Sequence, residues 1–232
     1  MTISIKFNSD FRIFKKDSTH VVEFDNSGIT WLTGGNGCGK STFMQLLRSR
    51  RDSLQKLNLK MRDGMEPSVY RSLREVDVTI DGLDQYDNCF FLDTVMDNPT
   101  SFENSATAGA LMNGGGYEMM HISRGQGASV QIYKFVKNIK SIIGENDDQK
   151  NLIVLDEVDE GLDMNNQASL GKHLIPLMHT MYNADVVCIS HSIVPMLSCD
   201  RNDTVFSFDY QCFMPKIEYI NTLVGRKLKF DD

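Results

Sequence analysis

The sequence predicts an α/β protein with a mainly parallel central sheet, and three observations lead to this fold class. Strand-like apolar segments alternate with helix-like segments from about residue 30 onward. Two of them, NLIVL at 151–155 and ADVVCIS at 184–190, are largely apolar, as strands covered on both faces of a sheet are. The composition agrees, because 41% hydrophobic and 24% charged residues in a chain of 232 allow a sizeable core.

The first 32 residues predict an antiparallel group of strands. Three short segments with alternating side chains, ISIKF, FRIF and HVVEF, are separated by polar turns. GITWL then leads directly into a glycine-rich segment, and residues 41–57 have helical spacing, with Phe43, Leu46 and Leu47 on one side. A strand, a glycine-rich loop and a helix therefore follow one another.

The remaining segments continue the alternation. We expect strands at VDVTI and NCFFLDTV, helices at 127–143 and 168–182, and closing strands from DTVFSFDY through KIEYI. Residues 97–116 are small and polar and end in three glycines, which predicts a mobile loop or lobe. The chain is interpreted as one domain, with the antiparallel group at about 1–32, a core of 33–93 and 150–232, and a small lobe at about 94–149.

Composition excludes several classes of protein. No apolar run approaches the roughly 18 residues of a membrane span, and the N-terminus has no signal-peptide core, so we expect a soluble, cytoplasmic chain without direct membrane insertion. The five cysteines lack CxxC spacing and are odd in number, so they predict neither a zinc site nor a disulfide framework. They are interpreted as small buried hydrophobes in a reducing compartment.

Charge is unevenly distributed along the chain. The segment from Arg48 to Arg74, called the basic window below, holds eight basic and three acidic residues and is net +5. Because the whole chain is −7, the remainder carries −12. Global acidity argues against a general nucleic-acid coat, whereas the basic window is either a local surface for nucleic acid or an acidic protein, or a solvated helix face.

The glycine-rich segment TGGNGCGKST at 33–42 predicts a phosphate-binding loop. It matches G-x-x-x-x-G-K-[ST] in full, and its glycines allow backbone N–H groups to curl around a polyphosphate. Lys40 is expected to reach the β- and γ-phosphates, Ser41 to bind Mg²⁺, and the following helix to direct its positive end at the anion. The predicted nucleotide contacts are Gly34, Gly35, Asn36, Gly37, Cys38, Gly39, Lys40, Ser41 and Thr42.

Two carboxylates follow the apolar strand at 151–155. Asp156 stands at the carboxyl end of that strand, where it is placed to hold Mg²⁺ through water. Glu157, one residue later, is placed to act as general base on an attacking water. The alternative is an acidic surface turn, which the nearby phosphate-binding loop disfavours.

A third motif, Ile122-Ser123-Arg124-Gly125-Gln126, lies between these two and precedes a helix. It resembles the LSGGQ signature of ATP-binding-cassette (ABC) ATPases, with Arg124 at the place of the first glycine. The resemblance covers residues from about 30 to 192 and implies a P-loop ATPase of the ABC fold with a small helical signature lobe, using ATP and Mg²⁺. It also implies a homodimer formed on ATP binding, in which Ser123, Gly125 and Gln126 contact the nucleotide held by the other subunit.

Two more motifs match the family in order. Glu160-Gly161-Leu162-Asp163 stands at the place of the D-loop, so the resemblance implies a nucleotide-side role for Asp163, and His191 matches the switch histidine that hydrogen-bonds the γ-phosphate. At the place of the family's glutamine loop this chain has Asp93, which either approaches the Mg²⁺ or the attacking water or has a structural role; Gln85 is a poorer match. Phe11 and Phe14 are weak matches to the adenine-stacking aromatic.

The sequence leaves three functions open. The first is an ATP-hydrolysing engine that drives a protein or DNA partner, because the 83 residues from Lys40 to Ser123 leave only a small lobe, as in compact stand-alone ABC-type ATPases of bacteria and phages. Its link to DNA metabolism is an analogy. The second is the nucleotide-binding subunit of a membrane transporter. The third is a nucleotide-gated binding module with little turnover.

Overall fold

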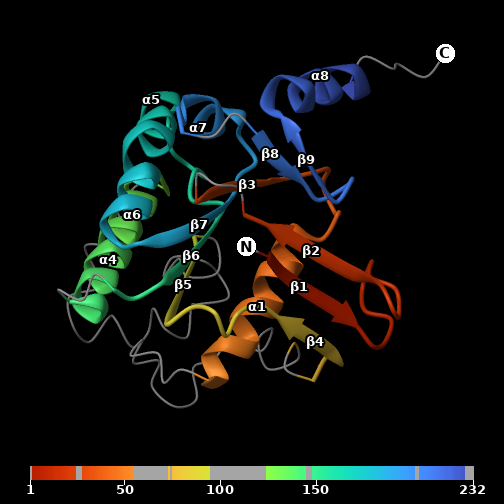
Figure 1. Cartoon of the computed structure of the whole chain (residues 1–232). Coiled ribbons are helices and arrows are strands. Elements are labelled where there is room, and N and C mark those ends of the chain that lie inside the picture. Colours follow the sequence, from red (N-terminus) through yellow and green to blue (C-terminus); the bar gives the residue numbers. More distant parts are fainter. Residues whose placement is uncertain are drawn as a thin grey trace.

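The computed structural model describes residues 2–24, 28–54, 73, 75–94, 124–144, 148–201 and 204–227. Of these, the side chains at 51–54, 124–126 and 224–227 are left undescribed. The elements, shown in Figure 1, are as follows: β1 (Thr2–Phe7), β2 (Thr19–Glu23), β3 (Ile29–Thr33), α1 (Lys40–Leu54), β4 (Val78–Asp81), β5 (Asn88–Asp93), α4 (Arg124–Ile143), β6 (Asn151–Asp156), α5 (Met164–Ser169), the π-helical turn η4 (Leu170–Leu174), α6 (Ile175–Met181), β7 (Ala184–Ile189), α7 (Ile193–Ser198), β8 (Thr204–Ser207), β9 (Cys212–Pro215) and α8 (Lys216–Lys227).

The central sheet confirms the predicted α/β architecture. Its strand order is β5-β6-β7-β3-β8-β9, and the pairs from β5 through β8 are parallel, while β9 pairs with β8 in the antiparallel direction. Every residue of β6 is buried, as the apolar pattern NLIVL predicts. The parallel strands place their carboxyl ends at one edge, where the loops after β3, β5, β6 and β7 meet.

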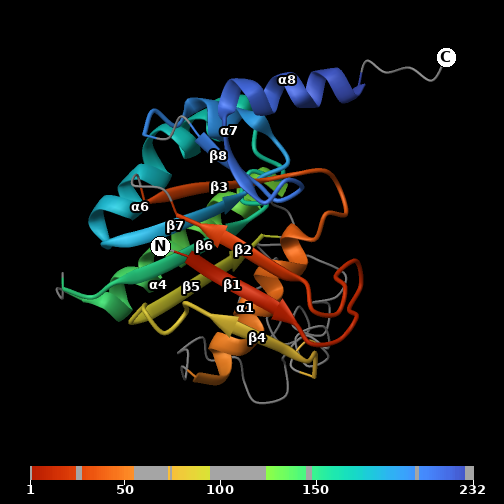
Figure 2. The ribbon, with the colours of Figure 1, turned by 45° about the vertical axis from the view of Figure 1, so that its right-hand side comes forward.

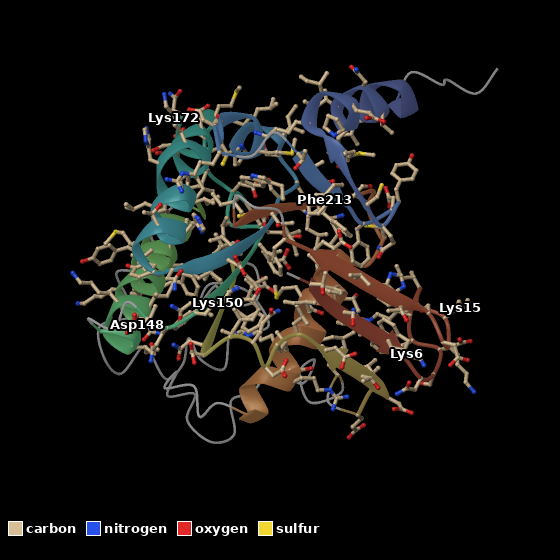
Figure 3. The ribbon with its side chains drawn as sticks, viewed as in Figure 1. Lys6, Lys15, Asp148, Lys150, Lys172 and Phe213 are labelled. Carbon is tan, nitrogen blue, oxygen red and sulfur yellow. The ribbon has the colours of Figure 1, made fainter. Side chains whose placement is uncertain are left out.

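The N-terminal antiparallel group is a separate three-stranded sheet in the order β2-β1-β4. Two details differ from the sequence expectation. GITWL forms β3 of the central sheet, whereas the third strand of the antiparallel group is β4, which comes from after α1. FRIF forms no regular strand: Phe11 and Phe14 make a mutual bridge around a tight turn, because Arg12 adopts a positive φ of 52°. Lys6 and Lys15 extend outward from this sheet (Figure 3).

Two apolar cores cover the two faces of the central sheet. Leu152 and Val154 of β6 point into the core shared with α1 and the antiparallel sheet, whereas Ile153 and Leu155 point into the core shared with the helices from α4 to α8. Figure 1 and Figure 2 show these two layers on opposite sides of the sheet. The alternation follows from the two-residue period of a strand. Of the five cysteines, Cys89, Cys188 and Cys199 are buried in these cores, and all five are free thiols.

The helices follow the predicted amphipathic segments, with one correction. KIEYI at 216–220 is the start of α8 and not a closing strand. Tyr219, Ile220 and Leu223 all contact the second core, and their spacing is that of one helical face. In the described ranges, every helix is too short or insufficiently apolar to cross a bilayer. Residues 97–116, where the loop or lobe is predicted, lie outside the described residues.

The helical segment after β6 contains a π-helical turn where it contacts α7. A Cβ atom built on Gly171 would lie 1.9 Å from the carbonyl oxygen of Pro195, so the helix backbone and α7 touch directly at this point. Only glycine permits so close an approach. The interruption between α5 and α6 therefore allows α7 to lie against η4.

Gly171→Ala tests this contact. The added methyl group must push α7 away from η4, and overpacking of this kind costs about 1–3 kcal/mol of unfolding free energy. Urea unfolding followed by circular dichroism measures the change. Ser169→Ala, at an exposed position two residues earlier, is the matched control and should alter stability little. Equal midpoints for Gly171→Ala and wild type would show that the two helices do not touch as described.

Candidate functional site

The glycine-rich loop joins β3 to α1 at the carboxyl edge of the central sheet. Gly34, Gly37 and Gly39 have φ angles of 147°, 80° and 99°, which side chains with a Cβ atom rarely adopt. At Gly39 there is also no room for a side chain, because a Cβ atom would lie 2.4 Å from Cζ of Phe14. The loop backbone is therefore tightly curled, as that of a phosphate-binding loop is.

Lys40 opens α1 and folds back over the loop. Its side chain is buried, and Nζ donates to the carbonyl oxygens of Gly34 at 3.0 Å and Gly35 at 3.1 Å, with the Cys38 sulfur at 3.4 Å. Burial raises the pKa of the Cys38 thiol, which keeps that group neutral beside the ammonium. The positive charge is thus held inside the loop, next to the N-terminus of α1, where an anion is stabilised.

Two C-terminal side chains hold the start of the loop, and the sequence does not predict them. The Gly35 N–H donates to Oδ2 of Asp209 at 2.8 Å, and the Gly34 N–H donates to the Tyr219 hydroxyl at 3.3 Å. Asp209 and Tyr219 lie after β8 and in α8, more than 170 residues from the loop. No motif marks them, because only the fold brings these residues to the loop.

Arg12 is a further neighbour of the loop that sequence reasoning missed. Its Nη1 donates to Oγ1 of Thr42 at 2.7 Å, and its guanidinium lies over the Phe11 ring. The tight turn at 11–14 therefore carries a cation to the first turn of α1. A single arginine between two phenylalanines gives no local signal for this position.

Two carboxylates lie side by side at the ends of β5 and β6. Asp93 and Asp156 are directly opposite in the strand register, and their side chains are 3% and 2% exposed. Burial raises the pKa of Asp156, and the nearby Asp93 and Glu157 carboxylates raise it further, to about 8. A hydrogen bond from Ser41 and the charge of Lys40 act in the opposite direction. Four of the predicted site residues, Lys40, Ser41, Asp93 and Asp156, are thus brought together.

This cluster suits a hard divalent cation. Asp156 Oδ1 is buried and has no hydrogen-bond partner, and Mg²⁺ prefers such oxygen ligands while keeping several waters. In the described parts of the chain, no group of three or more His, Cys, Asp or Glu side chains is arranged to hold a metal. The protein ligands that fit Mg²⁺ are therefore only the Ser41 hydroxyl and the carboxylates of Asp156 and Asp93. The remaining coordination positions are left to water and phosphate oxygens.

Glu157 follows β6 in a strained conformation. Its φ is 55°, a left-handed value that costs a non-glycine residue about 1–3 kcal/mol. Two hydrogen bonds hold Glu157 there. Its N–H donates to the Ile189 carbonyl at 3.0 Å, and the Thr94 hydroxyl donates to the Glu157 carbonyl oxygen. Backbone strain fixed by neighbouring strands is typical of functional sites.

His191 reaches the Glu157 carboxylate. Its Nε2 lies 2.8 Å from Oε1 of Glu157, although the histidine side chain is 58% exposed. The loop after β7 thus presents a histidine to the loop after β6, beside the carboxylate cluster. The arrangement places a candidate base, a histidine, the carboxylate cluster and a lysine along one edge of the sheet.

The remaining predicted residues are placed differently. Asp163 is exposed and caps α5, accepting from the Asn166 N–H at 2.9 Å, so this chain gives it a structural role whatever it contacts elsewhere. Gly125 and Gln126 lie in the first turn of α4, with their side chains undescribed, and Ser123 lies outside the described residues. Gln85 donates to the Gly82 carbonyl before β5 begins, at the edge away from the glycine loop.

The two weak candidates for an adenine-stacking aromatic are both used inside the protein. Phe14 is 1% exposed and stacks on Phe7 with ring centroids 4.3 Å apart. Phe11 packs partly buried against the same core. Phe14 cannot present a face to a base, because its ring is enclosed between β1 and the glycine loop.

The basic window is only partly described, and the described part points inward. Arg48 is 3% exposed, and Nη2 of Arg50 donates to the Val76 carbonyl. Both side chains are therefore committed to this domain. The other basic residues of the window have side chains that lie outside the described part of the chain.

Several solved structures resemble the chain, and those compared are ABC proteins. An inward-facing ABC transporter of metal-chelate type matches at a TM-score of 0.48 and 18% identity, over 97% of this chain and 88% of that chain. An ATP-binding cassette in a dimeric post-hydrolysis state with ADP and phosphate matches at 0.44 and 13%, over 88% and 93%. CbiO1 from Clostridium perfringens, part of the ABC transporter complex cbiONQ, matches at 0.45 and 18%, over 97% and 93%.

No protein-family model matches the sequence, and no curated protein does. With identities of 13–18% and TM-scores of 0.44–0.48, the structural similarities transfer no residue role to this chain.

Asp156→Asn tests the carboxylate cluster through pH. The folded protein holds the Asp156 proton up to about pH 8, whereas the unfolded chain releases it near 3.8. The folded state therefore binds more protons between these values, and this group makes stability fall as pH rises through that range. Thermal unfolding in chelator-containing buffer should show a decline toward pH 8 that Asp156→Asn reduces. Parallel curves of stability against pH for the two proteins would contradict a raised pKa of Asp156 in the folded state.

Proposed function

We propose that the chain is a cytoplasmic ABC-type ATPase that binds ATP with Mg²⁺ and hydrolyses its terminal phosphate. One observation carries the proposal: the glycine loop with Lys40 and Ser41 adjoins Asp156, and the next residue, Glu157, is paired with His191 at 2.8 Å between Oε1 and Nε2. A nucleotide-binding loop alone needs no such pair. A carboxylate paired with a histidine beside a phosphate site suits the activation of water.

Each group of the chain has a distinct part in this proposal. The loop amides and Lys40 bind the phosphates, and they neutralise charge that develops on the leaving oxygens. Ser41, Asp156 and Asp93 would hold Mg²⁺, whose bound form supplies a Lewis acid to the phosphate oxygens. Glu157 accepts the proton of the attacking water, and His191 orients that carboxylate and reaches toward the γ-phosphate.

A dimer completes the site in this proposal. His191 is 58% exposed, and the site stands at the carboxyl edge of the sheet. The motif ISRGQ at 122–126 precedes or opens α4, whose N-terminus is an anion-binding end. We infer that the segment from a second copy covers the nucleotide, so that ATP joins two chains. Ser123, Gly125, Gln126 and Asp163 belong to this trans contribution.

Glu157→Gln separates hydrolysis from binding. Losing a general base should lower steady-state ATP turnover by about a hundredfold or more, while binding by the glycine loop remains. Malachite-green phosphate release measures turnover, and light scattering with ATP measures the dimer, which the variant should accumulate. Glu160→Gln, an exposed carboxylate three residues later, is the matched control and should turn over as wild type does. Full turnover in Glu157→Gln would remove Glu157 from the reaction.

Wild type without any turnover, but with an ATP-dependent dimer, would favour the nucleotide-gated binding module. Co-purification with a membrane protein would favour the transporter subunit. Both outcomes leave the nucleotide site in place and change only what the site drives.

For the partner, the net +5 of the basic window is the feature that points to nucleic acid. Because Arg48 and Arg50 are committed inside the domain, reversal of charge at Lys56 and Lys60 is the cleaner test. If the window binds DNA with ATP present, gel retardation should weaken steeply with salt, and the slope of log K against log salt should fall by about 1 for each lost phosphate contact. No retardation of duplex DNA at low salt would exclude this partner.

A further inference from the structure

The loop that carries His191 is held by one buried carboxylate, which accepts a hydrogen bond from the residue after the histidine. Asp159 is 4% exposed, and its Oδ2 accepts from the Ser192 N–H at 3.2 Å. The same N–H also donates to the Ser190 hydroxyl oxygen at 3.0 Å, and that hydroxyl donates to the Ser192 carbonyl oxygen at 2.6 Å. Asp159 therefore holds the residue after His191 directly, and Ser192 in turn holds the residue before it.

A second side chain closes this arrangement. Gln167 of α5 donates from Nε2 to the carbonyl oxygens of Asp159 at 3.3 Å and Leu162 at 3.0 Å. Its Oε1 accepts from the Ser192 hydroxyl at 2.7 Å. The turn after β6 and the turn after β7 are thus linked through one amide, which uses both its donor and its acceptor.

The helix after His191 is held as well. Ser192 caps α7, because its Oγ accepts from the Val194 N–H at 3.2 Å, and α7 lies against η4 at the Gly171–Pro195 contact. The backbone on the C-terminal side of His191 cannot drift without breaking these contacts. Its N-terminal side continues directly from β7.

The imidazole itself has little to fix it. At 58% exposure it is not packed into place, and the contact shown for its ring is that with Glu157. An exposed side chain gains order only at a cost in rotamer entropy, so its position depends on where the backbone points it. The buried carboxylate of Asp159, two residues after the strained Glu157, holds the backbone that sets this direction.

We propose that Asp159 is a positioning residue of the ATPase site, which holds the Ser190–Ser192 turn so that His191 meets Glu157. The expected effect on kcat rests on the proposed function, whereas the effect on the position of His191 rests on the hydrogen bonds alone. In this proposal Asp159 acts through His191, because the hydrogen bond of its side chain goes to the loop that carries the histidine.

A double-mutant cycle tests this chain of action. Asp159→Leu keeps about the size of the side chain but removes both acceptor oxygens, so kcat should fall about tenfold or more through misplacement of His191, with KM for ATP changed less than about twofold. His191→Ala should lose at least as much. The double variant should be no slower than His191→Ala alone, because Asp159 then has nothing to position.

The control is Asp185→Asn. Asp185 is a partly buried carboxylate on β7 that accepts from the Tyr86 hydroxyl at 2.8 Å and pairs with Lys150 at the opposite edge of the sheet. Lys150 is labelled in Figure 3. Wild-type kcat is expected for this variant. Multiplicative losses in the double variant, or an equal loss in Asp185→Asn, would overturn the proposal.

A second measurement is independent of turnover. In ¹⁵N-histidine NMR spectra, with the His191 signal assigned by its loss in His191→Ala, Glu157→Gln should shift the Nε2 resonance of His191. The same change in an Asp159→Leu background should shift it little, because His191 and Glu157 are already apart. Equal shifts in both backgrounds would overturn the positioning role. If wild type hydrolyses no ATP, the proposed function fails and this spectrum alone decides the inference.

Discussion

The site is organised around the crowding of negative charge at the carboxyl ends of β5 and β6. Parallel pairing in register puts Asp93 directly beside Asp156, and Glu157 follows immediately. Buried carboxylates that close together cannot all ionise without a compensating cation. Lys40 and the Ser41 hydroxyl compensate in part, and the unpartnered Asp156 Oδ1 shows that compensation is incomplete. A divalent cation bound to a polyphosphate would therefore compensate the negative charge that remains at this site.

The rest of the site surrounds this charge through rigid elements. Glu157 is held at a positive φ by hydrogen bonds from two neighbouring strands, and His191 is directed onto it by the turn after β7. The position of this turn depends on Asp159, Gln167 and the close packing of α7 on η4. Loops at the edge of a parallel sheet are thus set by buried contacts, which gives the geometry a precision that exposed loops lack.

Local patterns were sufficient to predict most of the fold and the centre of the site. The glycine loop, the apolar β6 and its two carboxylates carry their chemistry in a few adjacent residues, so their position at one sheet edge followed from the parallel architecture. The strand predicted at 216–220 was wrong, because a short run with apolar residues at 217, 219 and 220 suits either period until Leu223 joins it on a helical face.

Contacts made across long sequence separations could not be predicted in the same way. Asp209 and Tyr219 reach the glycine loop from the far end of the chain, and Arg12 reaches Thr42 through an irregular turn. Asp159 lies between two predicted motifs, yet its partner Ser192 belongs to the loop after another strand. These residues carry no spacing signal, because their role exists only once the sheet has formed.

Calorimetric titration of ATP into the protein, with and without Mg²⁺, tests the central claim most directly. The geometry predicts saturable binding of one nucleotide per chain that Mg²⁺ strengthens, and loss of that strengthening in Asp156→Ala. Heats that do not saturate at millimolar ATP in the presence of Mg²⁺ would contradict the assignment of this site.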